Sequence, residues 1–103
     1  MVFIATPIFT ADVHVLLSDV EYARLQEHLV RHPDAGDVIA GTGGLRKIRW
    51  TSAGKGKPGG SRVNYFNAVA QSQIRMLLIY RKGIKGDLTP KEKSVVRKIN
   101  AEW

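Results

Sequence analysis

The 103-residue sequence contains no cysteine, and this absence removes several kinds of chemistry from consideration. Without thiols there is no disulfide, no cysteine-ligated zinc and no cysteine nucleophile. Long apolar runs are also missing, because the longest, 76–80, is far shorter than the ~20 residues of a membrane-spanning helix. The opening MVFIATPIF lacks the basic start and the extended apolar core of a secretory signal. We therefore expect a cytoplasmic protein with no membrane partner.

Acidic residues are absent from a long central stretch of the chain. Residues 38–86 hold ten lysines and arginines and no aspartate or glutamate, and the whole chain has a net charge of +7. Such a stretch is typical of a surface that binds a polyanion. A merely solubilising surface is the alternative, although solubility normally mixes the two signs. An anionic membrane is less favoured, since these basic residues lie in strand and glycine-loop patterns rather than on an amphipathic helix.

The overall composition is that of one globular domain. Hydrophobic residues make up 44% of the chain and charged residues 24%, which is ordinary for a folded protein and not for a disordered one. The length suits a single domain that covers residues 1–103. No repeat or interdomain linker is visible in it.

Three helices are expected from their start signals. Ser18 with Glu21, and Thr89 with Glu92, have the three-residue spacing of a capping box, in which each side chain accepts a hydrogen bond from the other's backbone. We expect a shorter helix that begins at Thr10 and ends near residue 16. The first two helices would form a hairpin.

Alternating and apolar segments predict a small sheet. In residues 45–51, Arg46, Ile48 and Trp50 share one face while Lys47 and Arg49 share the other. The expected strands are residues 3–9, 45–51, 61–69 and 73–82. The fold class is therefore α+β, with the helix hairpin and the C-terminal helix packed on one face of a mainly antiparallel four-stranded sheet. The other face would carry the basic side chains.

Several motifs that would indicate other functions are incomplete. The glycine-rich segments 41–44 and 53–60 do not match a nucleotide-binding phosphate loop. His28 and His32 share a helix face, a spacing that can bind a metal, but no third ligand stands out. We expect no metal site and no cofactor. A cluster of lysines and arginines suits metal-independent RNA cleavage, in which a base removes the 2′-hydroxyl proton and cations stabilise the pentacovalent phosphate.

The chain resembles the HigB branch of the RelE/ParE toxins. The resemblance rests on GTGGLRKIR at 41–49, GKGKPGGSRV at 54–63, IYRK at 79–82 and DLT at 87–89. It implies a toxin of a type II toxin–antitoxin pair with the RelE/ParE fold, which enters the ribosomal A site and cuts the mRNA there. It also implies a helix-turn-helix antitoxin as partner, through which alone the toxin would meet promoter DNA.

The resemblance and the chemistry together give two sets of candidate residues. The catalytic candidates are Arg62, Lys47, Arg49 and Lys82. The candidates for binding RNA or the ribosome are Lys55, Lys57, Arg46, Arg81, Lys85 and Tyr65. We expect Tyr80 to pack in the core. RelE-type enzymes place a tyrosine near the start of the last helix, where this chain has DLTP at 87–90, so the general acid must come from elsewhere. A non-catalytic, gyrase-directed toxin of the same fold and a general nucleic-acid-binding module remain as alternatives.

Overall fold

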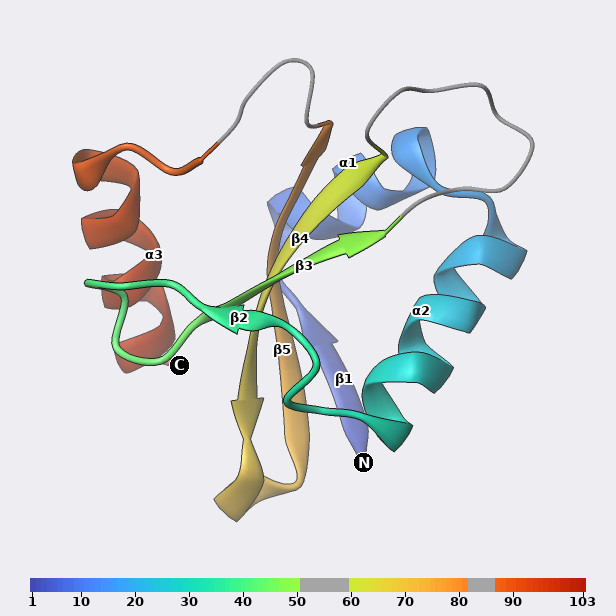
Figure 1. Cartoon of the computed structure of the whole chain (residues 1–103), viewed down its shortest axis with the longest axis horizontal. Helices are drawn as coiled ribbons and strands as arrows, with labels where there is room; N and C mark the ends of the chain where they lie inside the picture. Colours follow the sequence, from blue (N-terminus) through green and yellow to red (C-terminus); the bar gives the residue numbers. More distant parts are fainter. Residues whose placement is uncertain (51–59, 82–86) are drawn as a thin grey trace.

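The computed structural model describes residues 1–50, 60–81 and 87–103. These residues form three α-helices, five strands and a short 3₁₀ turn (Figure 1). In chain order the elements are β1 (Val2–Ala5), α1 (Pro7–Leu16), α2 (Asp19–Arg31), β2 (Asp37–Val38), β3 (Arg46–Trp50), β4 (Ser61–Ala68), the 3₁₀ turn η1 (Val69–Gln71), β5 (Gln73–Arg81) and α3 (Pro90–Ala101). The α+β class is confirmed. None of the helices in these ranges is long and apolar enough to cross a membrane.

The sheet has five strands, and not the four that were predicted. Its order is β1-β5-β4-β3-β2. The two-residue strand β2 was expected to be part of a connection, but it pairs with Arg46 and Lys47 of β3. The first strand lies parallel to β5, while the other pairings in the described sheet are antiparallel. The sheet is therefore mixed, with one parallel edge.

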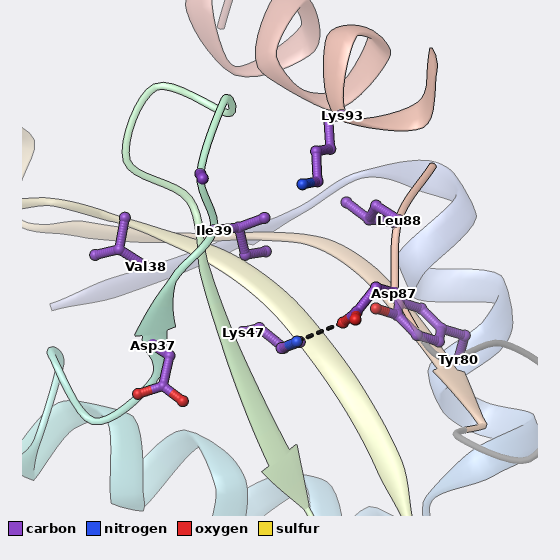
Figure 2. A pocket seen from close by; sticks show the side chains of 9 residues that line it. Asp37, Val38, Ile39, Lys47, Tyr80, Asp87, Leu88 and Lys93 are labelled. Atoms are coloured by element: carbon purple, nitrogen blue, oxygen red, sulfur yellow. Dashed lines mark hydrogen bonds and ion pairs between the residues drawn. The ribbon is translucent and has the colours of Figure 1, made fainter. Parts of the chain in front are cut away.

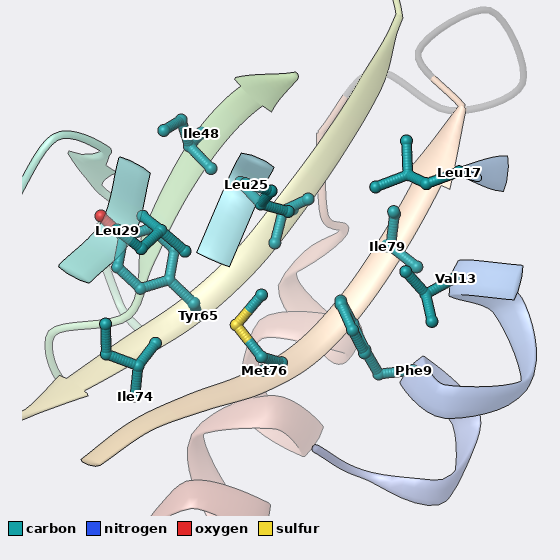
Figure 3. Packing of buried hydrophobic residues seen from close by; sticks show 11 residues of the cluster. Phe9, Val13, Leu17, Leu25, Leu29, Ile48, Tyr65, Ile74, Met76 and Ile79 are labelled. Atoms are coloured by element: carbon teal, nitrogen blue, oxygen red, sulfur yellow. The ribbon is translucent and has the colours of Figure 1, made fainter. Parts of the chain in front are cut away.

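The helices cover both faces of the sheet, which corrects the expectation that they share one face. Side chains of α1 and α2, among them Phe9 and Leu25, pack on one face over a cluster that includes Tyr65 and Met76 (Figure 3). On the opposite face, Leu88 and Val96 of the C-terminal segment pack on Leu45 and Leu77. We call these the hairpin face and the α3 face.

A bulge in β5 allows both faces to be apolar. Asn64 pairs with Leu78 and Tyr65 with Met76, so Leu77 has no partner opposite it in β4. A bulge of this kind shifts the alternation of a strand by one residue. As a result Met76 and Ile79 both lie in the hairpin-face cluster, whereas Leu77, Leu78 and Tyr80 belong to the α3 face.

The predicted caps of the second and third helices are confirmed, and that of the first is wrong. Both capping boxes are complete, at Ser18 and at Thr89. Helix α1 begins after Thr6 rather than Thr10, because the Thr6 hydroxyl accepts a hydrogen bond from the Phe9 N–H at 3.1 Å. The same hydroxyl donates to the Leu77 carbonyl at 2.8 Å. Thr6 therefore joins the start of α1 to the bulge of β5.

Candidate active site

Three of the predicted catalytic residues lie together on the α3 face of the sheet. Lys47 and Arg49 alternate with buried Ile48 along β3, so they point away from the hairpin face. Arg62 of β4 lies directly opposite Arg49. A hollow of about 340 Å³ is lined by Lys47, Arg49, Arg62 and Asp37. We call Lys47, Arg49 and Arg62 the cationic cluster.

The arrangement of the two arginines is costly for folding alone. Like charges directly opposite each other on neighbouring strands are destabilising. Arg62 is only 9% exposed, whereas Arg49 is exposed. The nearly buried Arg62 side chain has little freedom to move, and the planar fork of an arginine matches phosphate oxygens. The pair is therefore suited to hold an anion between the two strands.

Asp87 is bound to the cationic cluster from the segment that leads into α3. Its carboxylate accepts a hydrogen bond from Lys47 Nζ at 2.5 Å, and the two side chains form an ion pair (Figure 2). This hydrogen bond, followed by the charge of Lys47, lowers the pKa of Asp87 below its usual value. More distant charges on Lys93 and Arg62 act in the same direction. Asp87 is thus ionised at neutral pH and pairs with Lys47.

Tyr80 completes the row that runs across β3, β4 and β5. It lies opposite Arg62, which lies opposite Arg49. Tyr80 packs at the margin of the α3-face core, as predicted, but it also lines a hollow of about 250 Å³ beside Lys47 and Asp87 (Figure 2). Burial raises the pKa of Tyr80, and an Asn64 hydrogen bond and the Lys47 charge offset this only in part. Its hydroxyl therefore carries a proton at neutral pH and can donate it.

Three candidates for RNA binding do not reach the cationic cluster. Tyr65 is fully buried in the hairpin-face core, so its ring cannot stack on a base, and that prediction is wrong. Arg46 lies on the same face as Tyr65 and donates to the Gly36 carbonyl at 2.8 Å, where it fixes the chain before β2. Arg81 lies on the other side of β5 from Tyr80 and lines a hollow beside Asp12 of α1. The structure thus assigns Tyr65 and Arg46 to folding, and separates Arg81 from the site.

Four further candidates lie outside the described residues. They are Lys55, Lys57, Lys82 and Lys85. The glycine-rich loop at 53–60 lies outside them as well, except for Gly60. Their predicted roles stay predictions.

Sequence reasoning missed the two aspartates beside the cationic cluster. Asp37 of β2 lies opposite Lys47, and Asp87 forms the ion pair with the same lysine. A signal was present, because these aspartates stand immediately before and immediately after the acid-free stretch 38–86. Asn64, which is fully buried beside Tyr80, had no such signal.

No established protein-family model matches the chain. Within residues 1–50, 60–81 and 87–103, no group of three or more histidine, aspartate or glutamate side chains is placed to hold a metal ion. What the site offers chemically is therefore a set of cations, one protonated phenol and two carboxylates.

Proposed function

We propose that this chain is a ribosome-dependent mRNA endonuclease, the toxin of a type II toxin–antitoxin pair. One observation carries the proposal: Arg49, Arg62 and Tyr80 stand in one row across three neighbouring strands, with Lys47 beside them. The row supplies charge for a phosphate and a proton for a leaving group. The acid-free stretch of the sequence and the resemblance to HigB-type toxins support RNA as the polyanion.

In the proposed reaction the scissile phosphate lies between Arg49 and Arg62. The 2′-oxygen, after losing its proton, attacks the adjacent phosphorus, and the bond from phosphorus to the 5′-oxygen breaks. The two guanidinium groups stabilise the extra negative charge of the transition state, where such contacts contribute most. Tyr80 donates its proton to the departing 5′-oxygen, which is consistent with the raised pKa of its hydroxyl.

The base that takes the 2′-hydroxyl proton would come from outside the cationic cluster. Arginine keeps its proton at neutral pH, and the Lys47 ammonium is already engaged in the ion pair with Asp87. Of the predicted catalytic residues this leaves Lys82, whose place lies beyond the described ranges. The proposal also includes a helix-turn-helix antitoxin as partner, with the ribosome and its mRNA as target.

The proposal is tested by replacing Arg62 with alanine. We expect cleavage of mRNA on translating ribosomes, mapped by 5′-end sequencing, to fall by about 10²–10³-fold, the usual effect of removing one group that stabilises transition-state charge. Arg97→Ala is the matched control, because it removes an exposed arginine on α3. Thermal melts of both proteins show whether the fold is retained.

Arg49→Ala provides a second variant, since Arg49 is exposed and its loss removes little packing. Wild-type cleavage by folded Arg62→Ala and Arg49→Ala proteins would refute the assignment of the cationic cluster. Growth arrest without any mRNA cuts would instead indicate a non-catalytic toxin.

A further inference from the structure

A separate hollow of about 280 Å³ lies between α2 and the end of β3, on the hairpin side of the sheet. It is lined by Arg24, Glu27, His28, Arg31, His32 and Trp50. Four of these residues come from α2 at the spacing that places side chains on one helix face, and His32 is the residue that caps the end of the helix. None of these residues takes part in the proposed cleavage. We call this hollow the aromatic cleft.

Three aromatic rings follow one another along the aromatic cleft. The ring centroid of His28 lies 5.5 Å from that of Trp50 and 5.3 Å from that of His32. Trp50 is partly buried because it also packs against the hairpin-face core. Its ring is therefore held in place while part of it stays exposed. A fixed, partly exposed indole is a surface on which a planar ligand can stack.

Two arginines give the aromatic cleft a positive charge. Arg31 is paired with Glu27 at 2.9 Å, whereas Arg24 has no ion-pair partner in the described part of the chain. Both side chains are exposed. A ligand that combines an aromatic plane with an anionic group would match the rings and the guanidinium groups at once. Nucleotides have this combination.

We propose that the aromatic cleft binds one unstacked base of single-stranded RNA, with the neighbouring phosphate on Arg24. Proteins bind single strands by combining base stacking on aromatic side chains with cations along the backbone. The cleft is small, just below the ~300–1,000 Å³ of drug-sized ligand sites, which suits a single nucleotide. The inference extends the proposed function, but it requires only that the protein binds RNA.

The position of Trp50 connects the aromatic cleft to the cationic cluster. Trp50 follows Arg49 in β3, and their side chains leave the strand on opposite faces. The pairing of β2 with β3 stops at Lys47, so in the described structure no strand of the sheet covers the edge of β3 at these two residues. An RNA strand held at Arg49 can pass this edge and place a flanking base on Trp50.

A metal ion is the other ligand that His28 and His32 could hold, since residues four apart share a helix face. Over the described ranges no third metal ligand joins them. The indole of Trp50 and the two guanidinium groups would serve no purpose in a metal site. RNA is therefore the occupant that accounts for more of the lining, and the experiment includes metal as an opposing outcome.

The test uses Trp50 as its own reporter. The chain has two tryptophans, Trp50 and Trp103, so Trp103→Phe leaves Trp50 as the only emitter. A five-nucleotide oligoriboadenylate is added in buffer with EDTA, and Trp50 emission is followed. Binding of a 3′-fluorescein form of the same oligonucleotide is followed in parallel by anisotropy. We expect saturable quenching of Trp50 with the midpoint that anisotropy gives.

Variants then separate the aromatic cleft from general charge. Trp50→Leu should weaken binding roughly 5- to 150-fold, the equivalent of about 1–3 kcal/mol for one stacked base. Because Trp50 also packs in the core, Arg24→Ala is the second variant, with Arg97→Ala on α3 as a control of equal charge. Arg24→Ala should weaken binding several-fold more than Arg97→Ala does.

The proposal would be overturned if Trp50 emission stays unchanged while anisotropy shows saturation. It would also be overturned if Arg24→Ala and Arg97→Ala weaken binding equally. Quenching by Zn²⁺ in a separate titration without EDTA, together with no quenching by RNA, would assign the cleft to a metal. Arg62→Ala should lower ribosome-dependent cleavage by the same ~10²–10³-fold and keep the Trp50 signal, so a loss of both would show that the signal comes from the cationic cluster. If RNA quenches Trp50 but neither the wild-type protein nor any variant cleaves mRNA, the proposed nuclease activity is refuted and the proposed RNA binding in the aromatic cleft still stands.

Discussion

Replacing Tyr65 with phenylalanine should destabilise the protein strongly through one atom. The Tyr65 hydroxyl accepts a hydrogen bond from the Gly36 N–H and donates one to the Pro33 carbonyl, both at 2.9 Å. Tyr65 is fully buried and Gly36 is buried as well. Without the hydroxyl, the Gly36 N–H remains inside the protein with no partner. A buried donor left in this way costs about 1–3 kcal/mol.

The surroundings leave little room for the loss to be repaired. A Cβ on Gly36 would lie 2.8 Å from the Lys47 carbonyl oxygen and 3.0 Å from the Tyr65 ring, so the chain here is packed directly against β3. We therefore expect a loss of about 2 kcal/mol, which for a domain of this size lowers the melting temperature by about 8–16 °C.

The assay is thermal unfolding of Tyr65→Phe, with Tyr22→Phe as the matched control. Tyr22 lies at the margin of the same core, and its hydroxyl meets the Gln26 side chain rather than a buried backbone group. Its loss should cost less. RNA cleavage by Tyr65→Phe, measured well below its melting temperature, should equal that of the wild type, because Tyr65 does not reach the cationic cluster. A melting temperature within about 2 °C of the wild type, or a selective loss of cleavage, would contradict this reasoning.

Two more outcomes follow from the site and the core. Asp87→Asn should raise RNA affinity, because Lys47 is then free to neutralise one more phosphate. The slope of log affinity against log salt should become steeper by up to about 0.7. An unchanged slope in salt titrations would show that Lys47 does not meet RNA. Burial raises the pKa of Tyr65, Tyr22 and Tyr80 above the ordinary value near 10. Their contribution to stability is therefore present below pH ~10 and is lost as pH rises through the folded pKa. Urea melts should show that the free energy of unfolding declines over this pH range, and that it declines less in Tyr65→Phe.

Local signals in the sequence located most of the elements. Ser18 and Thr89 were identified as caps because a capping box needs only four consecutive residues. Strand β3 was located because Lys47 and Arg49 alternate with Ile48. The two-residue strand β2 had no such pattern. It exists because Gly36 and its neighbours are held against β3 by Tyr65 and Arg46, which are distant in sequence.

The bulge in β5 is the reason that Arg81, a predicted RNA- or ribosome-binding residue, lies away from the cationic cluster. Without the bulge at Leu77, the alternation that starts at Met76 would place Leu78 and Tyr80 on the hairpin face and Arg81 on the α3 face. The extra residue reverses this order from Leu78 onward. A shift of one residue moves every later side chain to the other face of the sheet. Composition does not reveal a bulge, so the faces of Tyr80 and Arg81 required the structure.

The two aspartates at the ends of the acid-free stretch explain how a crowded cationic cluster can fold. Residues 38–86 run from β2 through β5, and the fold returns both ends of the stretch to Lys47. Asp37 lies opposite this lysine in the neighbouring strand, and Asp87 forms an ion pair with it from the segment before α3. The carboxylates offset repulsion among Lys47, Arg49 and Arg62 in the free protein. Asp87 is exposed and forms its ion pair with Lys47, so a phosphate can replace it there without disturbing the core. Acidic residues inside the stretch would pair with Arg49 and Arg62, and the site would then have less positive charge available for the proposed RNA. The acid-free stretch is therefore better understood as the span of sequence that builds the site, with its two counter-charges placed at the borders.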